Sequence, residues 1–273
     1  MTKLNYIDCS NVFALNPDMK INITYYEEFF PIITIDDFYL YPEKVRNLAF
    51  QIPITKGRSD KTSGYPGKRL NIDNFIDSEE FNRSLFRIFT EASDEVKYIN
   101  VSTNLVFNIF DTSEPLPSEH YSLPHTDPVE FAALIYLNHQ DESVPGTNLY
   151  KYKPGNLPMI PSTYAHMELL IKYYNRQNPG RFKNKVETVK FIKDTIVEYQ
   201  KEMQNLVKDN NNHILEDTDI WEIHTQAEPK FNRFMTYMGG MFHSAAIDYD
   251  YFEDKDYVRI NQVLFNAEKR DIG

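Results

Sequence analysis

The residues best suited to do chemistry are histidines that lie two positions before a carboxylate. Side chains on one side of an extended strand recur every second position, so a His-x-Asp pair can direct both groups at one metal ion. Three pairs have this spacing, namely His125 with Asp127, His139 with Asp141, and His166 with Glu168. Because the chain has seven histidines and 40 acidic residues, such pairs are expected by chance, and their surroundings must decide between them.

The surroundings favour the first pair. It directly precedes the apolar segment 130–138, which is predicted to be a strand, so both side chains would lie at the end of a sheet. The second pair lies in a polar segment before Pro145-Gly146, where an exposed turn is expected. The third pair lies on a predicted helix, in which residues two apart do not face each other.

Around this site the sequence predicts a mainly β protein with some helices. The predicted strands lie within residues 21–41 and at 102–110, 130–138, 147–152, 219–224, 232–239 and 257–266. A helix is expected from Pro42, with Val45, Leu48 and Ala49 on one face, and another after Asp77, which pairs with Glu80 as a capping box. The glycines and prolines of residues 52–73 predict a long loop. Many short strands between turn signals favour a β-sandwich or barrel.

Residues 162–212 interrupt this pattern. Two helices are predicted, separated near Asn178-Pro179-Gly180. The second has apolar residues at alternating steps of three and four, at Val189, Ile192, Ile196, Tyr199, Met203 and Leu206. We interpret this segment as a helical insertion within one domain that spans residues 1–273. We expect it to buttress the outer face of the sheet, while a dimer interface and a lid over the active site are the alternatives.

Three segments resemble the prolyl-hydroxylase-like branch of the iron(II)- and 2-oxoglutarate-dependent dioxygenases. They are ITIDDFYLYPEKVRNLAF at 33–50, PHTDPVEFAALIYLNHQDESVPGTNLYKY at 124–152, and FNRFMTYMGGMFHSAAID at 231–248. In that family a strand and Asp-Asp-Phe precede a helix, His-x-Asp precedes a strand ending in Tyr-Leu-Asn, and an Asn-Arg strand leads to Phe-His-Ser. Here Pro145-Gly146 replaces a glycine pair. The loop at 52–73 and the insertion lie outside the resemblance. Such parts usually determine substrate specificity in this family, so the resemblance does not identify the substrate.

The resemblance implies a double-stranded β-helix (jelly-roll, cupin-like) core, and Fe(II), 2-oxoglutarate and O2 as cofactors. It makes His243 the third metal ligand beside His125 and Asp127. It also implies that Arg259 binds the distal carboxylate of 2-oxoglutarate, a role suited to the planar guanidinium. Asn261, Tyr136 and Asn108 are further candidate contacts. The expected reaction is hydroxylation of a small-molecule or peptide substrate, with release of succinate and CO2.

The composition sets limits on this interpretation. The formal charge of −11 disfavours a nucleic-acid partner, and the single cysteine excludes a disulfide framework. No run of 18 apolar residues predicts a membrane span, so a cytoplasmic protein is expected. Two other functions fit the residues. One is a cupin-like metal enzyme that does not use 2-oxoglutarate, which Arg259 argues against. The other is a non-enzymatic jelly-roll binding module with a vestigial metal site.

Overall fold

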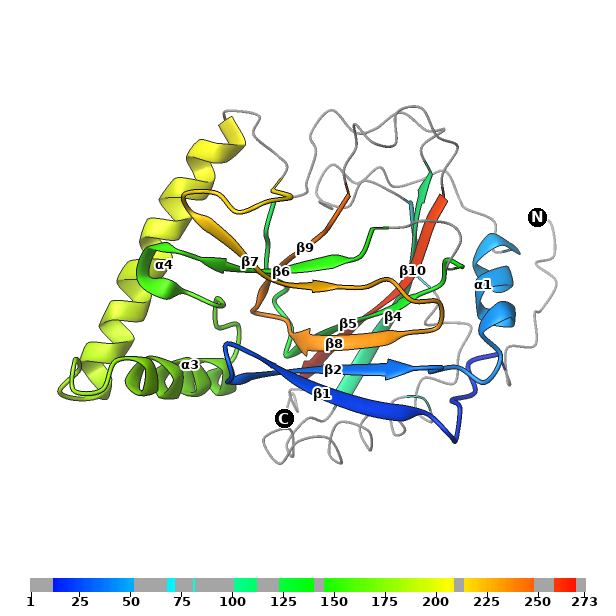
Figure 1. Ribbon diagram of the computed structural model, residues 1–273, viewed down its shortest axis with the longest axis horizontal. Coiled ribbons are helices and arrows are strands. Elements are labelled where there is room, and N and C mark those ends of the chain that lie inside the picture. The colour runs from blue at the N-terminus through cyan, green and yellow to red at the C-terminus, as the bar shows by residue number, and fades with distance from the viewer. Residues whose placement is uncertain are drawn as a thin grey trace, which may run out of the picture.

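Two antiparallel sheets form the body of the protein (Figure 1). The computed structural model describes residues 12–51, 68–71, 81, 101–111, 123–139, 145–208, 214–247 and 258–268. The strands are β1 (Lys20–Tyr26), β2 (Phe30–Asp36), β3 (Lys68–Asn71), β4 (Val101–Asp111), β5 (Phe131–Tyr136), β6 (Thr147–Tyr152), β7 (Trp221–Ala227), β8 (Phe234–Met238), β9 (Phe242–Ala245) and β10 (Val258–Glu268). The larger sheet has seven strands in the order β1-β2-β8-β5-β10-β4-β3, and the smaller has the order β7-β6-β9. The predicted mainly β class is confirmed.

Most of the helices in the structure are those predicted from the sequence. They are α1 (Pro42–Gln51), α3 (Tyr164–Gln177) and α4 (Lys185–Lys208), with a short 3-10 helix, η4 (Pro154–Asn156), that was not predicted. As predicted, α1 buries Val45, Leu48 and Ala49. The helix expected after Asp77 lies outside the described residues, apart from the buried Phe81. None of the helices in the described part of the chain is both long and apolar enough to cross a membrane.

Two strands differ from the prediction. The segment 52–73, expected to be a loop, contains β3, which pairs with β4 at one edge of the larger sheet. The four-residue strand β9 was not predicted either, because a strand this short has too few residues to show an alternating pattern. Its pairing with β6 places His243 opposite Leu149 in the smaller sheet.

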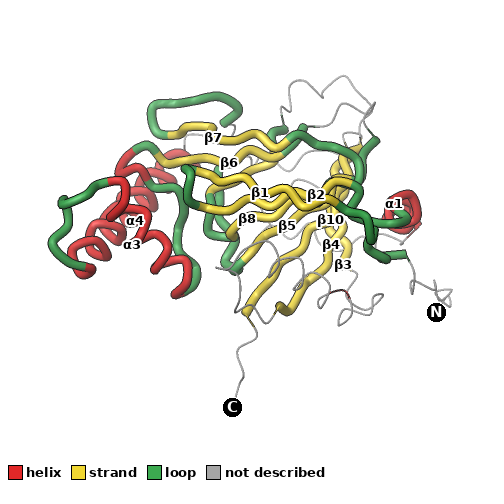
Figure 2. The backbone as a smooth tube through the Cα atoms, turned by 60° about the horizontal axis from the view of Figure 1, so that its bottom comes forward, coloured by secondary structure: helices red, strands yellow, loops and turns green. Residues whose placement is uncertain are grey.

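The smaller sheet lies across one face of the larger sheet (Figure 2). Two buried hydrogen bonds join the sheets: the Tyr136 hydroxyl donates to Thr147 Oγ1 at 2.9 Å, and the Tyr26 hydroxyl donates to the Tyr150 carbonyl at 2.9 Å. In the larger sheet, Asn261 of β10 lies directly opposite both Asn108 and Tyr136. Residues directly opposite each other have side chains on the same face of a sheet. Because the Tyr136 hydroxyl reaches Thr147 of the smaller sheet, all three polar side chains point toward that sheet.

The helical insertion lies at one end of the sheets (Figure 1) and packs on the smaller sheet. The Tyr199 ring of α4 lies 5.4 Å from Tyr152, 6.0 Å from Trp221 and 4.9 Å from Phe242. These are the residues at which β6 ends and β7 and β9 begin. Large aromatic surfaces of this kind contribute much of the burial energy of a core. The insertion is therefore part of the packed structure.

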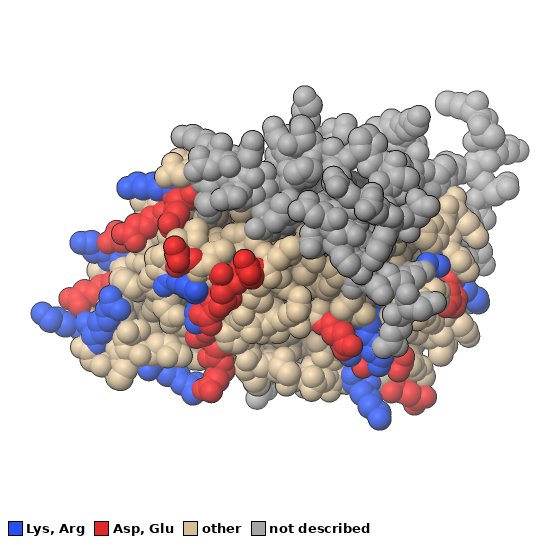
Figure 3. All heavy atoms as spheres, turned by 45° about the horizontal axis from the view of Figure 1, so that its top comes forward, with Lys and Arg blue, Asp and Glu red and all other residues tan. Residues whose placement is uncertain are grey.

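Charges of both signs cover the insertion. On the face drawn in Figure 3, lysine and arginine alternate with aspartate and glutamate over the helices at the left. The described residues on this face form no continuous basic patch of the kind that binds nucleic-acid phosphates.

A charged cluster ties the β1–β2 turn to the insertion. Lys151 Nζ lies 2.8 Å from Glu27 Oε1 and 3.0 Å from Glu222 Oε2, and the Tyr173 hydroxyl of α3 donates to Glu27 Oε2 at 3.0 Å. Burial raises the pKa of Glu27. The hydrogen bonds from Lys151 and Tyr173 outweigh burial and lower the pKa below its usual value of 4.5. Folding therefore favours the ionised Glu27.

The depressed pKa of Glu27 predicts a loss of stability in acid. The contribution is complete above about pH 4.5 and disappears as the pH falls through the lower pKa of the folded state. Glu27→Gln should cost about 1 kcal/mol at pH 7 and flatten this dependence, as measured by urea denaturation at several pH values. The neighbouring and exposed Glu28 is the matched control, and an equal effect of Glu28→Gln would contradict the assignment.

Asn232 joins two segments that the resemblance singled out. Its side-chain oxygen accepts from the Tyr39 amide at 2.9 Å, its side-chain nitrogen donates to the Tyr39 carbonyl at 2.9 Å, and its own carbonyl accepts from the Phe38 amide at 3.0 Å. The next residue, Arg233, pairs with Asp36 at 2.6 Å. The Asn-Arg and Asp-Asp-Phe motifs are thus bonded to each other, which fixes β8 beside β2.

Asn232 also has a φ of 61°, a left-handed conformation that few residues other than glycine and asparagine adopt easily. Asn232→Ala should lower the free energy of unfolding by about 2–4 kcal/mol, because it leaves buried backbone groups of Tyr39 unpaired and strains the backbone. Asn232→Gly removes the backbone strain but does not restore the hydrogen bonds to Tyr39, so it should recover about 1 kcal/mol of the loss. If alanine is tolerated without loss in thermal denaturation, the junction does not stabilise the fold.

Candidate metal centre

His125 and His243 lie side by side although 118 residues separate them in the chain. The His125 amide donates to the His243 carbonyl at 3.0 Å, and the His243 amide donates to the His125 carbonyl at 2.9 Å. Residues that exchange both backbone hydrogen bonds project their side chains on the same face. The two rings accordingly lie 4.5 Å apart between centroids.

Both histidines present the same ring nitrogen to the site. Nδ1 of His125 lies 3.2 Å from the Leu123 carbonyl, and Nδ1 of His243 lies 2.9 Å from the Met241 carbonyl. A carbonyl oxygen only accepts, so each Nδ1 carries a proton and donates it to the backbone two residues earlier. Each Nε2 then offers a lone pair to a metal ion, held in orientation by the bond at the other side of the ring.

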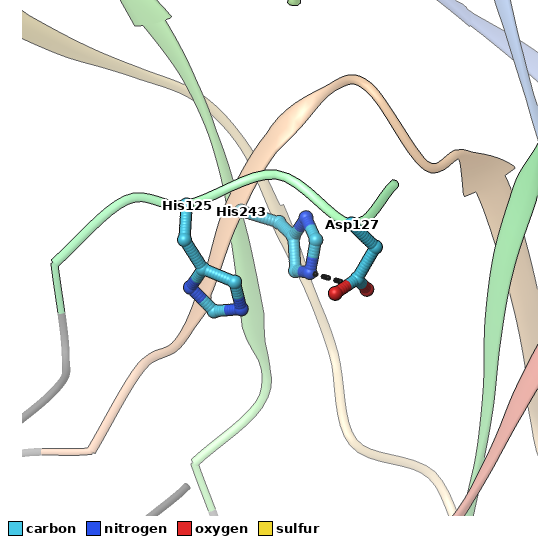
Figure 4. A group of neighbouring side chains, drawn as sticks. All are labelled: His125, Asp127 and His243. Carbon is cyan, nitrogen blue, oxygen red and sulfur yellow. Dashed lines mark ion pairs between the residues drawn. The ribbon is translucent and has the colours of Figure 1, made fainter. Parts of the chain in front are cut away.

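Asp127 completes the group (Figure 4). Its carboxylate Oδ2 lies 3.3 Å from His243 Nε2, and one donor atom from each of His125, Asp127 and His243 lies within 4.8 Å of the others. Ligands about 2.1 Å from one ion and at right angles to each other are about 3 Å apart. The arrangement therefore suits three ligands on one face of a six-coordinate ion. His243 is buried, Asp127 is partly buried and His125 is exposed, so the group lies at the edge of the protein interior.

Two glycines allow the ligand segments to approach. The Asp127 amide donates to the Gly239 carbonyl at 2.8 Å, and the Gly239 amide donates to the Glu130 carbonyl at 3.0 Å. A Cβ at Gly239 would lie 2.4 Å from the Val129 carbonyl oxygen, and one at Gly240 would lie 2.2 Å from that of Ile160. Neither contact is possible for a residue with a side chain. The Gly-Gly turn before β9 is thus required by close backbone approach.

Arg259 lies on β10 and is 2% exposed. Its Nε donates to the Pro145 carbonyl at 3.3 Å, and Nη1 lies 2.8 Å from the Asn261 amide oxygen when that amide faces the guanidinium. Among the residues that the structure describes, no carboxylate pairs with it. A buried cation with only neutral partners is costly, so this position favours an anion.

The remaining candidates lie around this arginine. The Tyr136 hydroxyl is buried and donates to Thr147; burial raises the pKa of Tyr136, while the Thr147 bond and the Arg259 charge lower it. Asn108 lies next to Asn261 in the sheet, and its buried Oδ1 has no hydrogen-bond partner in the described part of the chain. A buried polar atom of this kind has bonding capacity left for a ligand.

Sequence reasoning missed Tyr237. Its ring lies 4.9 Å from that of His243. Burial raises the pKa of Tyr237 well above its usual value, the Asp127 carboxylate raises it further, and the Arg259 charge opposes this change. Tyr237 is therefore within electrostatic reach of both the carboxylate ligand and the arginine. Its place two residues before the Gly-Gly turn, on the inward face of β8, was the available signal.

The two other His-x-acid pairs do not join the cluster. His139 lies 3.5 Å from Glu43 and stacks near Phe231, and its partner Asp141 lies outside the described residues. His166 is buried on α3, and both of its ring nitrogens face other groups. Within the described ranges, His125, Asp127 and His243 are the only three potential ligands that converge in this way.

This geometry predicts that alanine at His125, Asp127 or His243 weakens binding of Fe(II) or Mn(II) by about a hundredfold or more. A bound metal contributes on the order of 10 kcal/mol, shared among its ligands, so each ligand has a large share. Anaerobic calorimetric titration measures the change. His139→Ala is the matched control, because it removes a histidine from the competing motif. Equal losses in the control and the three variants would rule out this site.

Comparisons with known proteins give a family but no activity. No curated protein has a significantly similar sequence. A solved structure of a prolyl 4-hydroxylase from Phytophthora capsici aligns with a TM-score of 0.38 and 11% identity, over 88% of this chain and 59% of that one. The chain thus spans less than two thirds of that structure, and so distant a likeness carries no functional argument. The family model DUF6445, described as a family of unknown function, matches residues 17–167 and 181–259, and the chain belongs to this family.

Proposed function

We propose that this protein is an iron(II)- and 2-oxoglutarate-dependent oxygenase with a double-stranded β-helix core. The observation that carries the proposal is the combination of a two-histidine, one-carboxylate group with a buried arginine that pairs with no carboxylate of the described residues. This set of ligands suits ferrous iron and leaves coordination positions for a cosubstrate and oxygen. When bound, the iron would activate O2, one atom of which would hydroxylate a small molecule or peptide while the other oxidises 2-oxoglutarate to succinate and CO2.

The residues of the chain divide the work. His125, Asp127 and His243 hold the metal, and the backbone carbonyls of Leu123 and Met241 fix the orientation of the two rings. These carbonyls keep each Nδ1 protonated, so that each Nε2 is the metal-binding nitrogen. Such fixed geometry before binding lowers the cost of assembling the site.

Arg259 supplies the positive charge for the distal carboxylate of 2-oxoglutarate. Its guanidinium can form two parallel hydrogen bonds to a carboxylate, which a lysine cannot match. Asn261, Tyr136 and Asn108 surround it and offer further polar contacts to the same ligand. A dianionic keto acid would therefore be held between Arg259 at one end and the metal at the other.

A metal enzyme that does not use 2-oxoglutarate would have no carboxylate to neutralise Arg259. A binding module with a vestigial metal site would have no need for two histidines with the same protonated nitrogen. Both observations favour the oxygenase over these alternatives.

The proposal predicts succinate formation that requires Fe(II), 2-oxoglutarate and O2, even without the true substrate. Arg259→Ala should weaken 2-oxoglutarate binding by about 2–5 kcal/mol while leaving metal affinity close to that of the wild type. Arg233→Ala is the matched control, because Arg233 already pairs with Asp36 and Glu228.

The result also separates the alternatives. Metal binding without any 2-oxoglutarate dependence would favour the other type of metal enzyme. A protein that binds neither metal nor 2-oxoglutarate would favour the binding module, and either outcome would contradict the proposal.

A further inference from the structure

The insertion and the two residues that lead into it contact both segments that carry the candidate metal ligands. Met159 pairs with Met241 as a β-bridge, and the Ile160 amide donates to the Gly240 carbonyl at 2.8 Å. These contacts hold the turn that leads to His243. The segment that leads into the insertion is therefore bonded to the turn before His243, and α4 packs on the sheet ends further along.

His166 makes the corresponding contact with the segment that follows Asp127. Its Nε2 donates to the Glu130 carbonyl at 2.9 Å, and the Ser162 hydroxyl lies 3.1 Å from the Val129 carbonyl and 3.0 Å from His166 Nδ1. The side chain of Thr163 caps α3 by accepting from the His166 amide. His166 is 1% exposed, so its bond to the Glu130 carbonyl is shielded from water.

The Glu130 carbonyl is the centre of this arrangement, because it accepts two hydrogen bonds. One comes from His166 Nε2 and the other from the Gly239 amide, while the Gly239 carbonyl accepts from the Asp127 amide. A short chain of bonds thus runs from His166 through Glu130 and Gly239 to Asp127. Burial lowers the pKa of His166, opposed by the Glu130 carboxylate at 3.7 Å, so the ring is neutral near pH 7 with its proton on Nε2.

We propose that His166 is a positioning residue for the metal centre, through which the helical insertion holds Asp127 in place for metal binding. This inference rests on the proposed metal site, but it assigns a role to the insertion that neither the ligands nor the family match provides. His166 touches no ligand side chain; it acts on the backbone at Glu130. The role differs from that of a lid, because the contact is buried and is made without substrate.

The test compares replacements of His166 that differ in which hydrogen bond they keep. His166→Ala should weaken Fe(II) or Mn(II) binding by about tenfold, the effect typical of groups that orient ligands from outside the coordination shell. His166→Gln places an amide nitrogen near the position of Nε2 and should restore most of the affinity. His166→Asn has the same amide but is too short to reach Glu130, and it should resemble alanine.

Tyr173→Phe is the control for general weakening of the helix. It lies two turns further along α3 and loses its bond to Glu27 without touching the Asp127 segment. It should leave metal affinity unchanged. If His166→Ala does not fold, Ser162→Ala tests the same contact from an exposed position and should give a smaller loss in the same direction.

A second measurement is independent of the metal. In metal-free protein, the amides of Asp127 and Gly239 should exchange hydrogen about fivefold faster in His166→Ala than in Tyr173→Phe, because their bonds lose a fixed partner. Unchanged exchange at both amides overturns the positioning role. Unchanged metal affinity in His166→Ala, with normal binding by the wild type, also overturns it. A wild type that binds no metal contradicts the proposed function instead, and the exchange rates then decide whether the contact exists.

Discussion

The reciprocal backbone pairing of His125 with His243 is the contact on which the rest of the site depends. It is an isolated bridge between a loop and a four-residue strand, so no long ladder enforces it. The pairing exists because the Gly-Gly turn brings the two segments together and the Asp127 amide is bonded to that turn. Without this contact, two donors that are far apart in the chain would not meet.

Arg259 is a buried charge whose presence packing alone does not explain. If no anion bound there, an apolar residue in place of Arg259 would stabilise the protein, because a buried cation whose described partners are all neutral is unfavourable. Its position beside Asn108, whose buried Oδ1 has no hydrogen-bond partner among the described residues, is understandable if a ligand completes the hydrogen bonding. The keto acid of the proposed reaction would supply the missing negative charge.

Much of the architecture could be predicted from local sequence. The apolar spacing after Pro42 gave the buried face of α1, and the steps of three and four gave α4. Both depend on residues close in the chain. The strand β9 and the edge strand β3 could not be predicted, because each is too short to show a period and is defined by its partner strand.

The same division applies to the site. The spacing of His125 and Asp127 was visible, but the choice of His243 needed the resemblance, since no local pattern connects residues 118 positions apart. Tyr237 and His166 could not be assigned, because their surroundings are formed by segments distant in sequence. The sequence correctly indicated that His166 is not a metal ligand, because it lies on a helix. Its contact with Glu130 could not be predicted from that position.

Anomalous diffraction at the iron edge, from crystals grown anaerobically with Fe(II) and 2-oxoglutarate, tests the central claim most directly. The account predicts one iron peak about 2.0–2.3 Å from His125 Nε2, an Asp127 oxygen and His243 Nε2. It also predicts electron density for the keto acid between the iron and Arg259. An iron bound elsewhere, or an Arg259 that pairs with a carboxylate of the protein itself, would contradict it.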